Sequence, residues 1–359
     1  MGSIKVAPKD LEAFVIEAMR HYGIREADAR LAAEISVTTD TWGVHTHGTR
    51  QLRPLLKNFP IGRLDKNAVP EVTREGAAWA LIDGHHSLPF VTAHNAMKLA
   101  IQKAKSTGIA YVSVIHTSHF GAAGYYAVMA AEHGMIGMAM CNADPNMVVP
   151  GARGKVLGTN PIAYAIPAGK NKPVFFDIAT SAAAANKVIR AKLQGESIPE
   201  GWLVNAEGEP TTDPSGFPET GALMPMANHK GYGFALLVEV LAGVMTGAAL
   251  TKDQPSWVPN VPGNPPGQAN QGQMFMAIDA GAILMPDVFD QRMEWLADYI
   301  HESPKAKGSE RIYLPGEMEW ERREEALKKG MTLPSDVVDY LKGLADDVGM
   351  PFPFEMVTE

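Results

Sequence analysis

Apolar side chains recur every three or four residues near the N-terminus, across residues 9–42. They fall into two runs: Leu11, Phe14, Val15, Ala18 and Met19, then Ala27, Leu31, Ala32 and Ile35. This spacing puts the apolar residues of each run on one side of a helix. Residues 9–42 are therefore predicted to be helical, and residues 92–106 show the same period.

The pattern changes in the centre of the chain. Short apolar runs at 109–116 and 135–142 flank a segment, 122–133, with helical character. Two strands joined by a helix commonly lie parallel in one sheet, because the helix crosses back over the sheet. These residues therefore predict a β-α-β unit with parallel strands.

Further elements follow along the chain. Strands are predicted at 162–167, 174–178 and 274–278, and helices at 181–193, 286–302, 317–329 and 335–346. Residues 251–273 contain five prolines and three glycines, which predicts a long irregular loop. The apolar run 231–250 is interrupted by Glu239, which indicates a buried helix and not a membrane span.

Together these elements predict an α/β fold, with a mixed central sheet and helices from both chain ends. A chain of 359 residues is long enough for more than one lobe. We expect a mainly helical lobe from residues 1–75 and 286–359, and an α/β lobe from residues 76–285 that carries the sites.

Composition narrows the class of protein. The net charge of −8, without a basic run, argues against nucleic acid as a partner. Residues 1–10 have no apolar leader segment, and a single cysteine, Cys141, cannot form an internal disulfide. A cytoplasmic protein with no membrane contact is therefore expected.

Histidines gather at two places that suit proton transfer. His45 and His47 follow a predicted helix, and His116 and His119 lie at the end of a predicted strand. Loops at the carboxyl ends of strands commonly carry the sites of α/β proteins. Imidazole exchanges a proton near neutral pH, as hydride transfer to a carbonyl requires. The alternative is that these side chains only cap backbone groups.

The turn from His119 to Gly124 is built mostly of small residues and leads into a helix. Backbone N–H groups at such a helix start can bind phosphate, although small residues can equally serve close packing. A Rossmann fingerprint is missing, because Leu236 occupies the third glycine position after Gly231 and Gly233. P-loop and Gly-x-Ser-x-Gly motifs are also absent from the sequence.

A metal site is the main alternative. The pairs His45/His47 and His116/His119, with Asp40, Asp83 or Asp177, could serve a metal-dependent hydrolase or lyase. No general-base carboxylate stands at a fixed spacing from either pair, as it does in His-Glu-x-x-His. We therefore prefer a site without metal.

Six motifs in order carry a family resemblance: Thr46–Gly48, Ser118–Tyr126, Gly158–Pro161, Asp177–Ser181, His229–Gly233 and Leu314–Glu317. From about residue 8 to about residue 345 the sequence resembles the malate/L-lactate/ureidoglycolate dehydrogenase family. That family also includes sulfolactate dehydrogenases, diketogulonate reductases and cyclic ketimine reductases. The resemblance implies a family-specific, non-Rossmann NAD(P)-binding fold.

The resemblance also implies an activity and its residues. It implies a homodimer that transfers a hydride between NAD(P) and a small 2-hydroxy or 2-oxo acid. His47 would be the catalytic acid/base, Thr46 would orient it, His119 would be a second candidate, and Thr159 would contact the substrate. The implied cofactor-binding residues are His119, Phe120, Gly121, Ala122, Ala123, Asp177, Ile178, Ala179, Thr180, His229, Lys230, Gly231, Arg311, Leu314, Pro315, Gly316 and Glu317.

The sequence departs from the family pattern at the substrate end. Many members carry an arginine four residues after the histidine, where this chain has Gln51. Arg50 or Arg53 is expected to bind the substrate carboxylate instead, and Lys187 to lie near the acid/base. NAD is the expected cofactor, with NADP as the alternative. Gln51 also leaves open a binding protein that has lost turnover.

Overall fold

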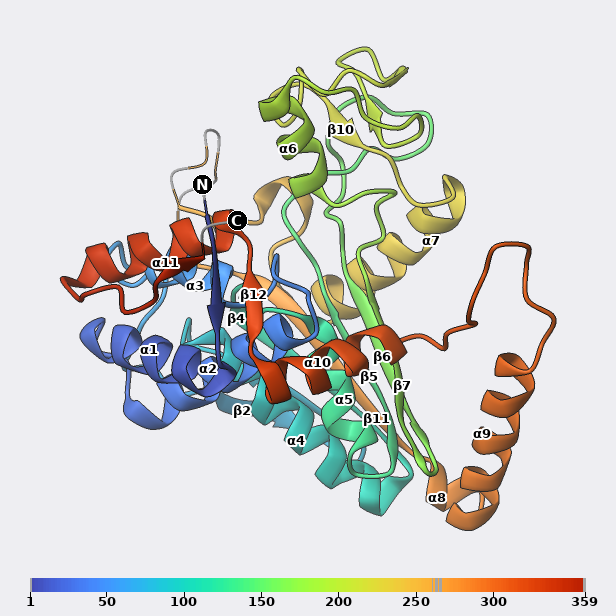
Figure 1. Ribbon diagram of the computed structural model, residues 1–359. Coiled ribbons are helices and arrows are strands. Elements are labelled where there is room, and N and C mark those ends of the chain that lie inside the picture. The colour runs from blue at the N-terminus through green and yellow to red at the C-terminus, as the bar shows by residue number, and fades with distance from the viewer. Residues whose placement is uncertain (1, 260, 262–263, 265–266, 358–359) are drawn as a thin grey trace.

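The computed structural model describes residues 1–359 except 1, 260, 262–263, 265–266 and 358–359. Its centre is one large mixed sheet with helices on both faces (Figure 1). The strands of this sheet, in spatial order, are β2 (Glu71–Glu75), β3 (Trp79–Asp83), β4 (Ile109–Thr117), β11 (Gln271–Asp279), β5 (Met135–Cys141), β6 (Ile162–Ala168) and β7 (Asn171–Ile178). The predicted α/β class with a mixed sheet is confirmed. β2 and β3 were not predicted.

The order of the strands corrects one prediction. β4 and β5 do run in the same direction, because each pairs antiparallel with β11. They are not neighbours, however, since β11 lies between them. The pairing of β3 with β4 is the parallel one among the described strands. The β-α-β prediction was wrong in making the two strands neighbours. β11, about 130 residues later in the chain than β5, lies between them, and a local sequence pattern cannot predict such a distant insertion.

Helices cover both faces of the sheet. α4 (Pro89–Thr107) and α5 (Ala123–Ala131) pack on one face, where Val112, Val114 and Phe275 are buried. α7 (His229–Val238) and the π-helix η2 (Glu239–Val244) pack on the other face, against Met274 and its neighbours. Met274 and Phe275 are adjacent in β11 and so point to opposite faces. The strand is therefore apolar on both sides.

The two chain ends pack together on one side of the sheet. α1 (Pro8–His21) and α2 (Glu26–Thr41) pack against each other, and α11 (Ser335–Val348) contacts α1. A small sheet joins β1 (Ser3–Val6) to β12 (Met331–Leu333) and β13 (Met356–Val357). The short helices η1 (Thr49–Gln51) and α3 (Leu52–Leu56) also contact α11. The predicted helices at both ends are confirmed.

A second small core lies apart from the main one, at the top of Figure 1. It contains α6 (Ala185–Gln194), β8 (Leu203–Val204), β9 (Pro210–Thr211) and β10 (Ala222–Leu223). α6 begins four residues later than predicted, because Ser181 forms a bridge with Pro225. The 251–273 loop contains the short helix η3 (Thr251–Asp253) before β11 begins at Gln271.

The C-terminal third adds α8 (Ala280–Ile283), α9 (Pro286–His301) and α10 (Glu317–Lys329). α10 contacts α2 and β7, whereas α9 contacts β6 and projects from the rest of the chain (Figure 1). β2 pairs with β3 across the predicted lobe boundary at residue 75. The two-lobe division therefore stays a prediction.

The apolar run 231–250 is helical as far as Val244, and only the side that packs against the sheet is buried. Phe234, Leu236 and Leu237 of α7 are exposed in this chain, and so are Val240 and Val244 of η2. Within the described residues, the chain has no helix that is both long and apolar enough to cross a membrane.

Phe275 links the central strand to the helical face, because its ring packs edge-on against Phe120 and Tyr126. Phe275→Ala should lower the free energy of unfolding by about 3–5 kcal/mol, through lost burial and the cavity that remains. Val72→Ala, in the exposed edge strand β2, should cost about 0.5 kcal/mol or less. Urea unfolding curves of both variants test this; similar midpoints would contradict it.

Candidate active site

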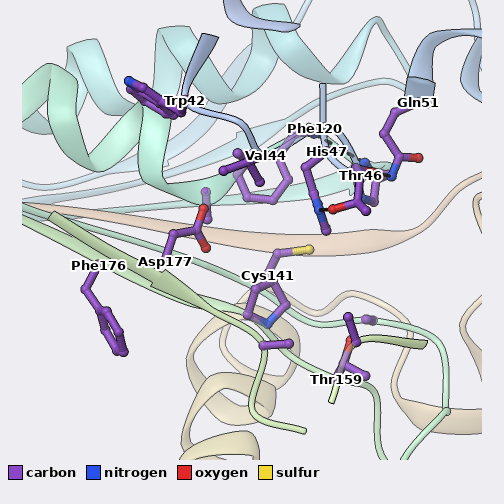
Figure 2. Close-up of a pocket in the computed structure, with 18 of the residues that line it drawn as sticks. Trp42, Val44, Thr46, His47, Gln51, Phe120, Cys141, Thr159, Phe176 and Asp177 are labelled. Atoms are coloured by element: carbon purple, nitrogen blue, oxygen red, sulfur yellow. Dashed lines mark hydrogen bonds between the residues drawn. The ribbon is translucent and has the colours of Figure 1, made fainter. Parts of the chain in front are cut away.

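An elongated cleft of about 760 Å³ opens at the ends of the central strands. Its walls come from the turn after α2, the turn between β4 and α5, the end of β5, strand β7 and residues 313–319. Figure 2 shows His47, Thr46 and Gln51 at one end, and Trp42 and Phe176 toward the other. A pocket of this size suits a small-molecule ligand.

A buried carboxylate shapes the turn that carries His47. Asp40, in the last turn of α2, is fully enclosed, and its Oδ1 lies 3.0 Å from Nδ1 of His45. Its Oδ2 accepts hydrogen bonds from the backbone N–H of Thr49 at 3.0 Å and from the Thr49 hydroxyl at 2.7 Å. A Cβ atom on Gly48 would lie 2.2 Å from Asp40 Oδ1. The turn can approach the carboxylate this closely only with glycine at position 48.

Thr46 and Gln51 fix the surroundings of His47. Oγ1 of Thr46 lies 3.0 Å from His47 Nδ1, and the side-chain amide of Gln51 donates a hydrogen bond to the carbonyl of Thr46. Burial, with a smaller contribution from the positive charge of Arg50, lowers the pKa of His47 to about 4. The imidazole is therefore neutral at physiological pH and available as a base.

His119 faces His47 with ring centroids 5.6 Å apart in a stacked arrangement. The backbone N–H of Gly121 donates to Nδ1 of His119 at 3.2 Å, so Nδ1 is an acceptor and the ring hydrogen is on Nε2. Burial lowers the pKa of His119 to about 3, with a smaller contribution from His47. The indole of Trp257 covers the ring at 4.4 Å. His119 is thus a fixed, neutral hydrogen-bond donor.

The start of α5 is occupied by a side chain. The backbone N–H of Gly124 donates to Oδ2 of Asp177 at 2.7 Å, and a Cβ atom on Gly124 would lie 3.1 Å from the same carboxylate. Burial raises the pKa of Asp177 to about 6. The small residues of this turn therefore serve close packing, at Gly121 and Gly124 at least, as the alternative interpretation had it.

Comparison with known proteins identifies the group to which this cleft belongs. Residues 6–342 match the malate/L-lactate dehydrogenase family. The chain is 35% identical to malate dehydrogenase of Pyrococcus abyssi over 354 residues, which cover 97% of this chain and 96% of that protein. It is 33% identical to L-sulfolactate dehydrogenase of Methanocaldococcus jannaschii, over 96% of this chain and 97% of that protein.

Solved structures agree. The chain superposes on the sulfolactate dehydrogenase of M. jannaschii with a TM-score of 0.87 at 31% identity, over 97% of this chain and 98% of that chain. For malate dehydrogenase of Pyrococcus horikoshii OT3 the TM-score is 0.85 at 34% identity, over 99% of this chain and 97% of that one. The chain belongs to the malate/L-lactate dehydrogenase family. It is a dehydrogenase-type oxidoreductase for small hydroxy or oxo acids, and it uses a nicotinamide cofactor.

The structure brings many of the predicted residues of this dehydrogenase into the cleft. Those lining it are Thr46, His47, His119, Phe120, Gly121, Ala122, Ala123, Thr159, Asp177, Ala179, Leu314, Pro315 and Gly316. Thr180 lies just behind, where its hydroxyl and backbone N–H both donate to the carbonyl of Thr159. Glu317 fixes the neighbouring segment by accepting the N–H of Leu314 at 2.9 Å. Ile178 is not part of the lining.

Other predicted residues point elsewhere. Arg311 is exposed and pairs with Glu317 and Glu321. His229 and Lys230 are exposed at the start of α7, and Gly231 is buried against Met226. The packing of the 225–231 turn determines where these three residues lie, and a sequence motif does not predict that packing.

The three predicted cations also lie outside the cleft. Arg50 pairs with Asp336 of α11 at 3.1 Å, and its guanidinium lies 4.5 Å from the centre of the Tyr340 ring. Arg53 pairs with Asp347 through two hydrogen bonds of 2.7 and 3.0 Å. Lys187 is exposed, 5.9 Å above the ring of Trp202. Each cation has a partner outside the cleft, so the contact of Arg50 or Arg53 with a substrate carboxylate, and of Lys187 with the acid/base, stays a prediction.

The metal-site alternative is not supported by the geometry. His45 turns to Asp40, and Nδ1 of His116 lies 3.0 Å from Asp83. The described residues contain no group of three or more histidine, cysteine or acidic side chains that could hold a metal ion. Of the four histidines only His47 and His119 meet, so the two sequence pairs do not form one site.

Sequence reasoning missed several residues of the site. Trp257 covers His119, and the buried side chain of Asn58 donates to the Trp257 carbonyl at 2.9 Å. Gln271, at the start of β11, and Asp144, after β5, line the cleft. Trp257 lies in the proline-rich segment that was predicted only as a loop. A tryptophan in such a polar loop was the one local signal.

The charge of Arg50 can be tested without any ligand. Replacing Arg50 with methionine removes a positive charge near His47, which favours the protonated imidazole, so the pKa of His47 should rise. Arg53→Met removes an equal charge that does not contribute to the pKa of His47, and should leave it unchanged. NMR titration of the His47 ring in each variant measures both. An unchanged or lower pKa in the Arg50 variant would contradict the prediction.

Proposed function

We propose that the cleft binds NAD with its nicotinamide end beside His47 and His119, and that His47 exchanges a proton with the oxygen of a 2-hydroxy or 2-oxo acid. The observation that carries this proposal is the pair of buried, neutral imidazoles facing each other at one end of an elongated cleft. A neutral base and a neutral donor are what reversible oxidation of a hydroxyl group needs.

The residues present fit a dinucleotide. The cleft is long and has aromatic and small side chains along its walls. The bound cofactor would supply or accept the hydride. Phe120 to Ala123 would border the nicotinamide end, and Asp177, Ala179 and Leu314 to Gly316 would border the rest. Thr159, on the wall opposite His47 in Figure 2, would contact the substrate.

The histidines divide the chemistry. In the direction of oxidation, His47 would accept the hydroxyl proton while the Thr46 hydroxyl holds the ring through Nδ1. His119 would donate a hydrogen bond from Nε2 to the same oxygen, because its Nδ1 accepts from Gly121. In reduction His47 would return its proton. Trp257, held by Asn58, would keep water from this end.

The far end of the cleft supports NAD over NADP. The carboxylate of Glu319 lies in the lining with Tyr313 and Met318, and it interacts at 3.4 Å with Arg322, which lies outside the lining. The additional phosphate of NADP would bring two negative charges against the carboxylate of Glu319, whereas ribose hydroxyls can donate hydrogen bonds to a carboxylate. Glu319 therefore favours the unphosphorylated cofactor.

Exposed apolar surface supports a homodimer in the cytoplasm. Apolar side chains lie exposed on two parts of the chain: on α7 and the segment after it, Phe234, Leu236, Leu237, Val240, Val244 and Met245; and on and before α9, Met285, Trp295, Leu296 and Tyr299. Groups of exposed apolar side chains on a helix are typical of protein–protein interfaces. A second copy is the partner that the family resemblance suggests, and the single, buried Cys141 fits a reducing compartment.

His47→Asn tests the assignment of the acid/base. Losing the positioned base should lower kcat/KM by about 10²–10⁴ while the dissociation constant for NADH changes little. His21→Asn, at an exposed position on α1, should change neither. Steady-state kinetics with fluorescence titration of NADH separate the two effects. Full activity of the His47 variant would refute the role, and equal loss of cofactor binding would indicate a structural effect instead.

Glu319→Gln tests the cofactor preference. Wild type should have a higher kcat/KM with NADH than with NADPH, and the variant should narrow that ratio by about two- to fivefold, as expected for a partly exposed charge. Glu324→Gln, on the same helix, should leave the ratio unchanged. The ratio is measured from NADH and NADPH oxidation under the same conditions. A wild-type preference for NADPH would overturn the assignment.

A further inference from the structure

The substrate end of the cleft is polar but has no positive charge. The polar side chains that line the cleft include Gln51, Asn146, Thr159 and Gln271, which are neutral, and Asp144, which is acidic. No lysine or arginine lies in the lining among the described residues. A ligand carboxylate at this end must therefore be held by neutral donors, without a charged fork such as arginine provides.

The arginine nearest in sequence does not compensate. Arg50 precedes Gln51, but its guanidinium is engaged with Asp336 and the Tyr340 ring on the side of α11. The positive charge of Arg50 still acts on His47 at a distance, as the smaller of two contributions that lower the pKa of His47. Consecutive side chains of a 3₁₀ helix point in different directions. Arg50 and Gln51 are consecutive in η1, so Arg50 can face α11 while Gln51 faces the cleft.

Gln51 is itself fixed. It is 5% exposed and lines the cleft, and its amide nitrogen donates to the carbonyl of Thr46, next to His47. A carbonyl oxygen can only accept, so the nitrogen end of the Gln51 amide must face Thr46. Figure 2 shows Gln51 and Thr46 beside His47 at this end. The position that could place a cation beside the acid/base instead holds a neutral amide.

The number of carboxylates on an oxo acid should therefore decide how well this cleft binds it. One carboxylate can be stabilised by several neutral hydrogen bonds in a partly buried site. A second carboxylate would need its own donors on a wall that contains Asp144, whose charged neighbour Lys155 lies outside the lining, and a buried charge without a partner binds poorly. The carboxyl group of Asp144 interacts with Ser256, the residue before Trp257, whose indole covers His119.

We infer that this dehydrogenase selects substrates with a single carboxylate over dianionic ones, and that Gln51 sets this selectivity. The inference rests on the proposed function, since it concerns the substrate of the same site. It separates this chain from its relatives in substrate charge: a malate or sulfolactate substrate, as named for two of them, has two acidic groups.

The test compares two oxo acids of equal carbon number, 2-oxobutyrate with one carboxylate and oxaloacetate with two, using the full-length protein and NADH. Wild type should show a kcat/KM for 2-oxobutyrate that is higher by about tenfold or more. Gln51→Arg should shift the ratio toward oxaloacetate by about 10- to 100-fold, the range expected for a gained charge-assisted hydrogen bond.

Gln51→Met is the matched control. It removes the amide without adding a charge, so it should lower both values of kcat/KM and leave their ratio within about threefold of wild type. A Gln51→Arg variant that lost both activities alike would show that position 51 does not set selectivity, and would overturn its assigned role.

The remaining outcomes separate the inference from the proposed function. Oxaloacetate reduced by wild type as well as 2-oxobutyrate would overturn the inference, including the case in which a second copy supplies a cation, while the proposed function would stand. If NADH binds but neither oxo acid is reduced at millimolar concentration, the proposed function fails and the inference fails with it.

Discussion

The buried carboxylate of Asp40 is the contact on which the catalytic end of this dehydrogenase depends. It receives three hydrogen bonds from the turn that follows α2, through His45 and Thr49, and these flank His47 on both sides. An enclosed carboxylate is costly unless it is fully hydrogen-bonded, so the turn cannot relax without leaving a charge unpaired. Gly48 permits the close approach. The position of the imidazole therefore follows from the helix end behind it.

The second constraint is the insertion of β11 between β4 and β5. This places Gln271, at its first residue, beside the ends of both strands, where its amide donates to the carbonyl of Asn142 at 2.5 Å. It also brings the preceding loop over the cleft, so that Trp257 reaches His119. Strands separated by about 130 residues of sequence thus lie together at the base of the cleft, and the loop before β11 covers its histidine end.

Electrostatics sets the protonation state of the two facing histidines. Both facing histidines are neutral because burial outweighs any stabilisation of the imidazolium form. The arginines at the His47 turn are committed to carboxylates on α11, an element from the other end of the chain. The ion pairs that join η1 and α3 to α11 also hold these arginines away from the cleft. The packing of the two chain ends therefore affects the charge of the site.

The sequence by itself determined the helices at both ends, most central strands and the histidines and glycines of the site, because periodicity and short motifs are local properties. It also showed that Gln51 breaks the expected pattern. Only the tertiary structure decided which side chains meet: that β11 separates β4 from β5, that His45 and His116 turn away, and that Arg50, Arg53 and Lys187 find other partners. Partner choice depends on distances between segments far apart in the chain, and a linear pattern contains no such distances.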